Sequence, residues 1–521
     1  MTFRDLLLAG ALCASTISSS VSAGADTAEV EKLYRTHCGE CHNAHRLGGM
    51  GPALLPENLK RLRKNAAIDV IKNGRAATQM PGFGDKLSDD QIQSLVDYVY
   101  TPLPEIPAWG MEEIRASHII HNRESDLSDK PVFEVKDPLN LFLVVELGDH
   151  HVTLLDGDRM EPVHRFKSRF ALHGGPKYSP DGRFVYFASR DGWISKYDIY
   201  NLKLVAEIRA GINTRNQAVS ADGRYVMIAN YLPHTLVLLD ARDLSPIKLY
   251  DVKDSKGKTS RVSAVYTAPP RDSFIAALKD IPELWEISYD PPPGFGMWIH
   301  DYREDSGEDS TPDPFPVRKI TVADYLDDFF FDQDYISLVG TSREGKGQVV
   351  DMDVGRVVVP DLELPGMPHL ASGITWEYEG RTVMATPNLK KGNISVIDME
   401  TWKTIKNIET LGPGFFMRSH RDSPYAWVDV FFGPNKDVVH VIDKKTLEIV
   451  KTLRPAPGKT AAHVEFTRDG KYALLSIWDP DGAVVVYDGD TLEEIKRLPM
   501  NKPSGKYNVY NKTRYLEGTS H

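Results

Sequence analysis

The stretch DGRFVYFASRDGWISKYDIYNLKLVAEI, residues 181–208, decides the fold of most of the chain. It opens with an Asp-Gly turn, continues through a strand of alternating apolar residues and a second strand that ends in Asp, and finishes with a third strand. The same unit returns as DGRYVMIANYLPHTLVLLDARDLSPIKLY at residues 222–250, a step of 41 residues. Units of several strands that recur every ~40 to 50 residues predict a β-propeller.

Further copies set the expected number of blades. Three of them begin at Glu379, Ser423 and Asp469, at steps of 44 and 46 residues. Weaker copies begin near Leu139, Arg271 and Asp334. Together the copies predict eight blades, although the spacing alone also allows seven. The block 290–318 is Pro-rich and acidic and fits no strand pattern, so we expect an inserted loop there.

The chain before the repeats has helical patterning. We expect helices over residues 26–37 and 57–73, and a third that starts at a capping box formed by Ser88 and Gln91. Three helices in about 80 residues bury little apolar surface, so a cofactor among them would supply the missing core. The predicted fold class is α + β and multidomain. It has an all-α domain at 24–105, a linker at 106–130 and an eight-bladed β-propeller at 131–521.

The first 23 residues, MTFRDLLLAGALCASTISSSVSA, have the pattern of a signal peptide. A short apolar stretch follows Arg4, and Val21-Ser22-Ala23 offers small residues for cleavage after Ala23. A buried N-terminal helix is the alternative. The signal peptide predicts a periplasmic location, and the lack of any later run of ~18 apolar residues predicts no membrane span.

Composition limits the possible functions. The chain carries 73 acidic and 62 basic residues, a net charge of −11, which argues against nucleic-acid binding because phosphate contacts need a basic surface. Its 3 cysteines are too few for a disulfide framework.

Two of these cysteines lie in Cys38-Gly39-Glu40-Cys41-His42. This CxxCH motif predicts one covalent haem c, with both thiols attached to the porphyrin and His42 bound to the iron. A zinc site or a reactive disulfide is the alternative, but zinc would need two further ligands at suitable spacing.

The second axial ligand of that haem should come from the opposite side. Met80, in Gln79-Met80-Pro81, is the expected ligand because a Met-Pro turn before the third helix resembles the class I cytochrome c pattern. Met50 and His45 are the competing candidates.

The whole predicted mature chain resembles the cytochrome cd1 family. The segments Phe170–His173, Ser189–Gly192 and Lys506–Asn511 carry the resemblance. It implies a class I cytochrome c domain joined to an eight-bladed propeller that holds haem d1.

Three functions are known in that family, namely nitrite reductases, a haem d1 biosynthesis protein without haem c, and dihydro-haem d1 dehydrogenases. The nitrite reductases place two distal histidines over the iron. In this chain the segment 325–332 contains no histidine and has Asp327 at the expected position, whereas His369 matches the second. The segments 258–266, 277–287 and 517–521 resemble the biosynthetic members. The chain therefore resembles the dihydro-haem d1 dehydrogenases most.

The resemblance also implies site residues. His173 is the expected proximal ligand of the d1 iron, His369 the distal group, and His420 a candidate general base. Arginine forks suit the carboxylates of a tetrapyrrole. The expected cofactor-binding cations are Arg169, Arg190, Arg215 and Arg271.

The implied reaction is the last step of haem d1 biosynthesis, in which a propionate of dihydro-haem d1 becomes an acrylate. Dihydro-haem d1 is then the substrate and haem d1 the product, and electrons leave through haem c to a periplasmic acceptor. Other haem d1 biosynthesis proteins or nitrite reductase are further implied partners. The alternatives are a nitric-oxide-forming nitrite reductase and a non-catalytic haem d1 carrier.

Overall fold

The structure is a computed structural model that describes residues 27–49, 51–59, 62–74, 80–105, 107–292, 295, 313–342 and 346–514. The predicted signal peptide and most of the predicted loop at 290–318 lie outside these ranges.

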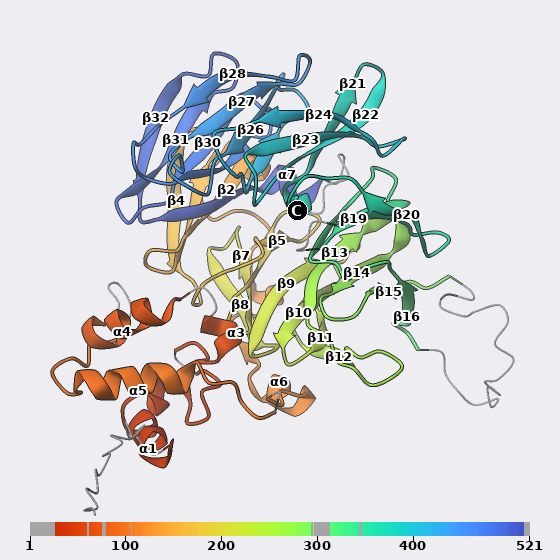
Figure 1. Cartoon of the computed structure of the whole chain (residues 1–521). Coiled ribbons are helices and arrows are strands. Elements are labelled where there is room, and N and C mark those ends of the chain that lie inside the picture. The colour runs from red at the N-terminus through yellow and green to blue at the C-terminus, as the bar shows by residue number, and fades with distance from the viewer. Residues whose placement is uncertain are drawn as a thin grey trace, which may run out of the picture.

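The strands of the described residues form eight sheets arranged around a common axis (Figure 1). Neighbouring sheets meet through one edge strand of each, which is the strand nearest the axis. These inner strands are β5 (Lys177–Tyr178), β9 (Asn213–Val219), β13 (Val262–Ala268), β17 (Asp328–Phe331), β21 (Ile374–Tyr378), β25 (Met417–Ser419), β29 (Ala461–Phe466) and β33 (Pro503–Asn508). The prediction of eight blades is therefore confirmed.

The other strands lie outside the inner ones. Those of the first four blades along the chain are β2 (Leu141–Glu146), β3 (His151–Asp156), β4 (Glu161–Lys167), β1 (Ile119–Ile120), β6 (Phe184–Ala188), β7 (Trp193–Asp198), β8 (Lys203–Arg209), β10 (Tyr225–Leu232), β11 (Thr235–Asp240), β12 (Pro246–Asp251), β14 (Ser273–Leu278), β15 (Glu283–Ser288) and β16 (Val317–Thr321). Those of the last four are β18 (Ser337–Thr341), β19 (Gly347–Asp351), β20 (Arg356–Leu362), β22 (Arg381–Pro387), β23 (Asn393–Asp398), β24 (Thr404–Glu409), β26 (Tyr425–Asp429), β27 (Val439–Asp443), β28 (Glu448–Leu453), β30 (Tyr472–Ile477), β31 (Gly482–Asp488) and β32 (Glu494–Met500).

The last strand closes the ring. β33 pairs antiparallel with β2, so that Phe142 lies opposite Asn508 and Val145 opposite Gly505. The C-terminal strand thus becomes the inner strand of the first blade, and its exposed edge is removed. Residues from the two ends of the propeller consequently meet at the axis.

The N-terminal helices form a separate layer beside the blades that contain β8 to β12 (Figure 1). They are α1 (Thr27–His37), α2 (Gly39–His42), α3 (Pro56–Leu59), α4 (Lys64–Asn73) and α5 (Asp89–Val99), and α6 (Met111–Ala116) follows them. The predicted capping box of α5 is present, because Ser88 Oγ accepts from the Gln91 N–H at 3.2 Å and Gln91 Oε1 accepts from the Ser88 N–H at 2.9 Å.

The single helix predicted over 57–73 is instead divided into α3 and α4. Leu55 packs against the propeller and Leu59 packs into the helical core, so this segment contributes to two different cores. The sequence was right that both parts are helical, but in α4 the buried residue is Ala67.

Contact between the helical domain and the propeller centres on Arg209, which is 5% exposed. Its guanidinium donates to the carbonyls of Leu47 and Gly48 in the helical domain and to that of Asp191 in the propeller. Ala53 and Leu55 pack beside it against Ile212 and Leu232. None of the helices within the described ranges has the length and apolar character needed to span a bilayer.

Candidate functional site

The CxxCH motif forms a short turn of helix after α1. Cys38 and Cys41 are half-buried free thiols, and His42 is buried. His42 Nδ1 lies 2.8 Å from the Pro52 carbonyl and donates to it, which leaves the lone pair on Nε2. Burial lowers the pKa of His42, so its imidazole is neutral and able to bind a metal.

A glycine permits this arrangement. A Cβ at Gly51 would lie 2.6 Å from His42 Cε1, so a larger residue would push the ring aside. Met80 is half-buried and packs against the apolar core of the same helices, which also contacts Cys38. Its competitor His45 is exposed, and Met50 lies outside the described residues.

A second group of imidazoles lies at the propeller axis. His173 precedes β5, and its Nδ1 donates to the Arg215 carbonyl at 2.8 Å. Its Nε2 accepts from Arg215 Nη1 at 2.7 Å. The proton on Nδ1 leaves a lone pair on Nε2, which is the form of histidine that ligates iron.

His369 has the same form. It precedes β21, and its Nδ1 donates to the Phe415 carbonyl at 2.6 Å. Its Nε2 lies 3.9 Å from Asp328 Oδ2, and Asp328 also accepts from the Tyr266 hydroxyl at 3.0 Å. The pKa of His369 is lowered to about 4, mainly by burial and in smaller part by the positive charges of Arg215 and Arg418.

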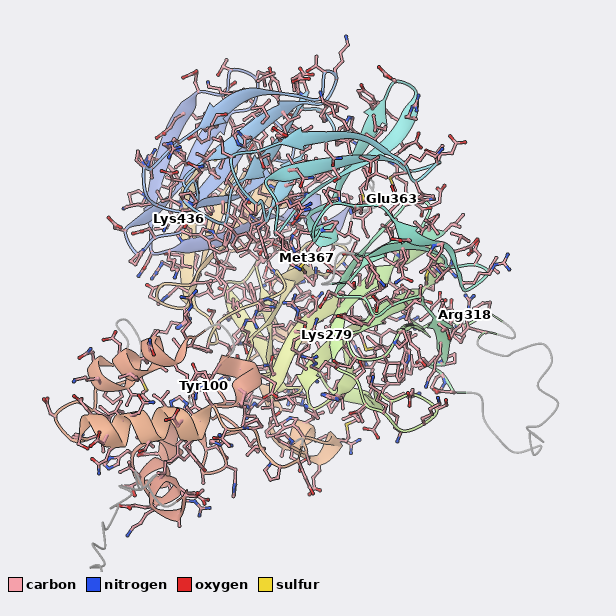
Figure 2. The ribbon with its side chains drawn as sticks, in the orientation of Figure 1. Tyr100, Lys279, Arg318, Glu363, Met367 and Lys436 are labelled. Atoms are coloured by element: carbon pink, nitrogen blue, oxygen red, sulfur yellow. The ribbon has the colours of Figure 1, made fainter. Side chains whose placement is uncertain are left out.

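Figure 2 shows Met367, two residues before His369, towards the middle of the propeller, whereas Arg318 on the outer strand β16 lies at its margin. The segment that carries His369 is thus directed at the axis.

Sequence reasoning missed two residues of this group, His463 and Tyr507. Their rings lie 5.1 Å apart between centroids, and His463 is 3% exposed. Within the described part of the chain, His463 Nδ1 is buried with no hydrogen-bond partner. The Tyr507 ring packs against Gly175, where φ is +69° and a Cβ would lie 3.1 Å from Cε1 of that ring.

These residues form a circuit around the axis. Contacts join its neighbouring members, except that Arg215 and Tyr266 are related by an electrostatic interaction. Every inner strand contributes, either from the strand or from the residues just before it. Its members in order are His173, Arg215, Tyr266, Asp328, His369, Phe416, His463 and Tyr507. Tyr507 returns the circuit to Gly175, two residues from His173. A flat ligand at the centre would therefore meet groups from all eight blades.

Buried cations surround the same centre. They are Lys177, Arg418, Lys506 and Lys512. Arg418, which is 9% exposed, repels each of the three lysines, and Lys177 and Lys512 also repel each other. Burial lowers the pKa of both Lys177 and Lys506 to about 7, and that of Lys512 to about 8. Among the described residues, Arg418 Nε is buried without a hydrogen-bond partner, and of these four cations only Lys512 has an ion pair, with Glu465. Buried positive charge of this kind needs an anion.

The structure places the predicted arginines differently. Arg215 belongs to the circuit, and the backbone of Arg190 lies beside it through a bond to the Ala171 carbonyl. Arg169 pairs with Glu207 at 2.7 Å and lies 3.9 Å from the centroid of the Trp193 ring. Arg271 pairs with Glu286 and Asp353 and follows the far end of β13. It is not brought to the circuit.

His420 also lies away from the circuit, at the opposite end of β25 from Phe416. Both ring nitrogens are engaged, because Nδ1 accepts from the Asp422 N–H at 3.2 Å and Nε2 lies 3.2 Å from the Arg468 carbonyl. The direction of the chain through the inner strands explains why Arg271 and His420 lie away from the circuit. Arg271 and His420 stand in turns that leave an inner strand, whereas His173 and His369 stand in segments that enter one.

Two family models match this chain, one over the propeller and one over the N-terminal helices. Residues 136–512 match the model described as cytochrome D1 heme domain, which is more than half of the chain. The chain belongs to the cytochrome d1 haem-domain family. Residues 25–99 match a second model, cytochrome C oxidase, cbb3-type, subunit III, so this family member carries a cytochrome c domain before its propeller.

Individual relatives are similar over nearly the full length. The chain is 58% identical to a dihydro-heme d1 dehydrogenase of Pseudomonas aeruginosa, with 96% of this chain and 97% of that protein covered. Protein NirF of the same organism is 28% identical over 70% of this chain and 90% of its own. A solved structure of dihydro-heme d1 dehydrogenase NirN in complex with DHE superposes with a TM-score of 0.86 at 59% identity and covers 93% of this chain and 99% of that one.

The described residues of this d1-family chain fit both groups that the family implies. The two unpaired thiols and the neutral His42 suit a covalent haem c. The cations and the orphaned Nδ1 of His463 suit a tetrapyrrole with several carboxylates.

The axial ligand of haem c can be identified by three single substitutions, Met80→Ala, Met50→Ala and His45→Ala. We expect only Met80→Ala to change the visible spectrum and to lower the reduction potential, because loss of the thioether removes the ligand that favours the reduced iron. Spectra and potentiometric titration of the purified proteins measure this. An unchanged spectrum in Met80→Ala would exclude Met80 as the axial ligand. A changed spectrum in one of the other two variants would then identify the ligand.

Proposed function

We propose that this chain is an oxidoreductase that oxidises one propionate side chain of dihydro-haem d1 to an acrylate, which yields haem d1. The circuit of ligand-type imidazoles with buried cations around it carries this proposal, and the near-full-length similarity to a dihydro-heme d1 dehydrogenase supports it. A large, flat, polyanionic substrate with a central iron satisfies each of these groups.

The chain's own residues bind and orient this substrate. His173 Nε2 and His369 Nε2 are the groups that would ligate the iron of the substrate, His173 once Arg215 no longer donates to it. Arg215, Arg418 and Lys506 pair with carboxylates at the rim. The carboxylates of the substrate supply counter-charges to these cations. Binding therefore raises the pKa of Lys506 towards its ordinary range.

Oxidation of the side chain removes two hydrogens from adjacent carbons, so that –CH2–CH2– becomes –CH=CH– with release of two electrons and two protons. His463 and Tyr507 are the groups best placed to handle a proton. Burial lowers the pKa of His463 well below its usual value, with Lys506, Arg418 and Lys512 adding to the shift, so the imidazole is neutral. Burial raises the pKa of Tyr507 to about 12, so its phenol keeps its proton and can relay one.

Cys38, Cys41 and His42 hold the haem c that, when bound, supplies a one-electron acceptor. The loop after the motif packs against the propeller, because Leu47 and Gly48 accept from Arg209 and Ala53 packs on Ile212. The electrons pass onward to a periplasmic acceptor protein.

We also propose the location, the domain bounds and the partners of the protein. Residues 1–23 are a signal peptide that directs the protein to the periplasm. Residues 24–105 form the cytochrome domain, 106–130 the linker and 131–521 the propeller. The protein hands finished haem d1 to other haem d1 biosynthesis proteins or to nitrite reductase.

Nitrite reduction is less well supported. Asp327, which stands where a first distal histidine is expected, forms a buried ion pair with Lys279 (Figure 2 shows Lys279 near the middle of the propeller). A carboxylate held in this way is a poor proton donor to nitrite, and the described segment 325–332 has no histidine to take its place.

Incubation of the purified protein with dihydro-haem d1 tests the function. We expect a product two hydrogen atoms lighter, together with reduction of two equivalents of haem c per product, because haem c takes one electron at a time. Mass analysis of the extracted tetrapyrrole and the haem c absorbance measure both. Binding without conversion would indicate a carrier, and steady nitrite turnover with retained haem d1 would indicate a reductase.

The role of the buried cations can be tested with Arg418→Met. We expect the dissociation constant for dihydro-haem d1 to rise ~10- to 100-fold, because a hydrogen bond to a charged group contributes roughly 1.5–3 kcal/mol. Arg271→Met is the matched control, since that arginine pairs with carboxylates at the other end of an inner strand. Equal affinity in Arg418→Met and the unmodified protein, measured by absorbance titration, would remove Arg418 from the site.

The proton-transfer role can be tested with Tyr507→Phe. We expect turnover to fall on the order of 100-fold with little change in substrate affinity, as is typical when a proton-transfer group is lost. His463→Gln should cost less, because three cations already make protonation of that imidazole unfavourable. Tyr197→Phe is the control, since its buried hydroxyl makes no hydrogen bond among the described residues. Full turnover in Tyr507→Phe would contradict the assignment.

A further inference from the structure

One buried carboxylate connects two of the imidazoles at the axis. Asp429 ends β26 and is 1% exposed. Its Oδ1 accepts from the N–H groups of Phe415 at 2.8 Å and Phe416 at 3.1 Å, and its Oδ2 accepts from the N–H of His463 at 3.3 Å. Within the described ranges no arginine or lysine forms an ion pair with it, so backbone donors satisfy this carboxylate.

Asp429 reaches His369 through a single peptide group. The Phe416 N–H that donates to Asp429 and the Phe415 carbonyl that accepts from His369 Nδ1 belong to the same peptide unit. A negative charge on the N–H side polarises that unit and strengthens the carbonyl as an acceptor. Asp429 thus acts on His369 as a hydrogen-bonded carboxylate would, but through the intervening peptide group. This makes His369 Nε2 a better metal ligand.

Asp429 reaches His463 directly. The pairing of β29 with β30 shifts register between Ala462 and Val464, so His463 is the extra residue of a β-bulge, and its φ is +57°. A left-handed conformation is costly for a residue with a Cβ and needs support from its surroundings. Asp429 holds the N–H of this residue, and Lys506 Nζ donates to its carbonyl.

This bulge decides where the imidazole points. In a regular strand, successive side chains alternate between the two faces, whereas a bulge turns one residue out of that order. The His463 ring packs 4.8 Å from Phe416 and 5.1 Å from Tyr507, between centroids. Asp429 therefore fixes both the Phe415–Phe416 segment under His369 and the backbone that aims His463.

We propose that Asp429 is a positioning residue that holds His369 and His463 in a fixed relation to each other and strengthens His369 as an axial ligand. Its burial supports the proposal. Burial raises the pKa of Asp429 to about 7, although its three hydrogen bonds from backbone N–H groups act in the opposite direction. The buried carboxylate therefore costs desolvation free energy that an apolar residue at this position would not. The consequence for catalysis rests on the proposed function, but the positional part does not.

Asp429→Asn is the sharpest change. Asparagine has the same shape and can accept from Phe415 and Phe416, but its amide would face the N–H of His463 with another donor. It also removes the charge that polarises the peptide. Asp437→Asn is the matched control, because Asp437 is 3% exposed, accepts from the Gly458 N–H at 2.8 Å and pairs with Arg454 without touching either histidine.

The first measurement uses the full chain with haem c attached and no tetrapyrrole added, so it does not depend on the reaction. Nitrogen NMR of labelled histidine side chains, assigned with single His→Gln variants, follows each imidazole. We expect Asp429→Asn to shift the signals of His369 and His463 together and to leave that of His173 in place, while Asp437→Asn leaves all three in place. Unshifted His369 and His463 signals in folded Asp429→Asn would overturn the proposal.

The second measurement uses the protein loaded with dihydro-haem d1. A weaker bond from His369 lets an added ligand compete for the iron, so we expect cyanide to bind at least ~10-fold more tightly in Asp429→Asn than in Asp437→Asn, a difference of about 1.4 kcal/mol. Equal cyanide affinity would show that the charge does not reach His369. If Asp429→Asn does not fold, Asp429→Glu keeps the charge but displaces it, and smaller shifts of the same two histidines are then expected.

Discussion

Positive charge buried at the propeller axis is the constraint on which the rest of this structure depends. Arg418 lies near both Lys177 and Lys506 inside a protein whose net charge is −11, and among the described residues none of the three forms an ion pair. Such an arrangement is unfavourable unless an anion compensates it. In the proposed binding mode, a tetrapyrrole with several carboxylates would supply that compensation and its iron would meet the imidazoles.

Closure of the ring makes this arrangement possible. The antiparallel pairing of β33 with β2 brings Lys506 and Tyr507, from the end of the chain, beside Gly175 near its beginning. Tyr507 can pack there only because position 175 lacks a side chain. The same pairing buries Lys506 in the inner layer, where it supports the bulge at His463. The strand pairing that closes the propeller therefore also positions Lys506 and Tyr507 in the site.

The sequence was sufficient for the architecture and for part of the site. The repeat near 40 to 50 residues predicted the propeller because each blade repeats one pattern, and CxxCH predicted haem c because its spacing is demanding. His463 was hidden in Ala461–Phe466, which reads as an ordinary buried strand, and only the bulge turns it to the axis. Arg271 and His420 stand in turns like those that favoured His173, but a turn that leaves an inner strand and a segment that enters one lie at opposite ends of it.

Strand β9 links the two redox sites of the molecule. Just before it, Ile212 packs on Ala53 and Leu55 of the cytochrome domain, and its carbonyl accepts from Asn58. Three residues later, the Arg215 carbonyl accepts from His173 Nδ1. The Pro52 carbonyl that holds His42 immediately precedes Ala53. His42 and His173, which we propose as iron ligands, are thus each oriented by a backbone carbonyl, and one apolar contact joins the two carbonyl-bearing segments. Electron transfer needs a short and rigid connection of this kind, and the fold builds it from an inner strand rather than from a flexible linker.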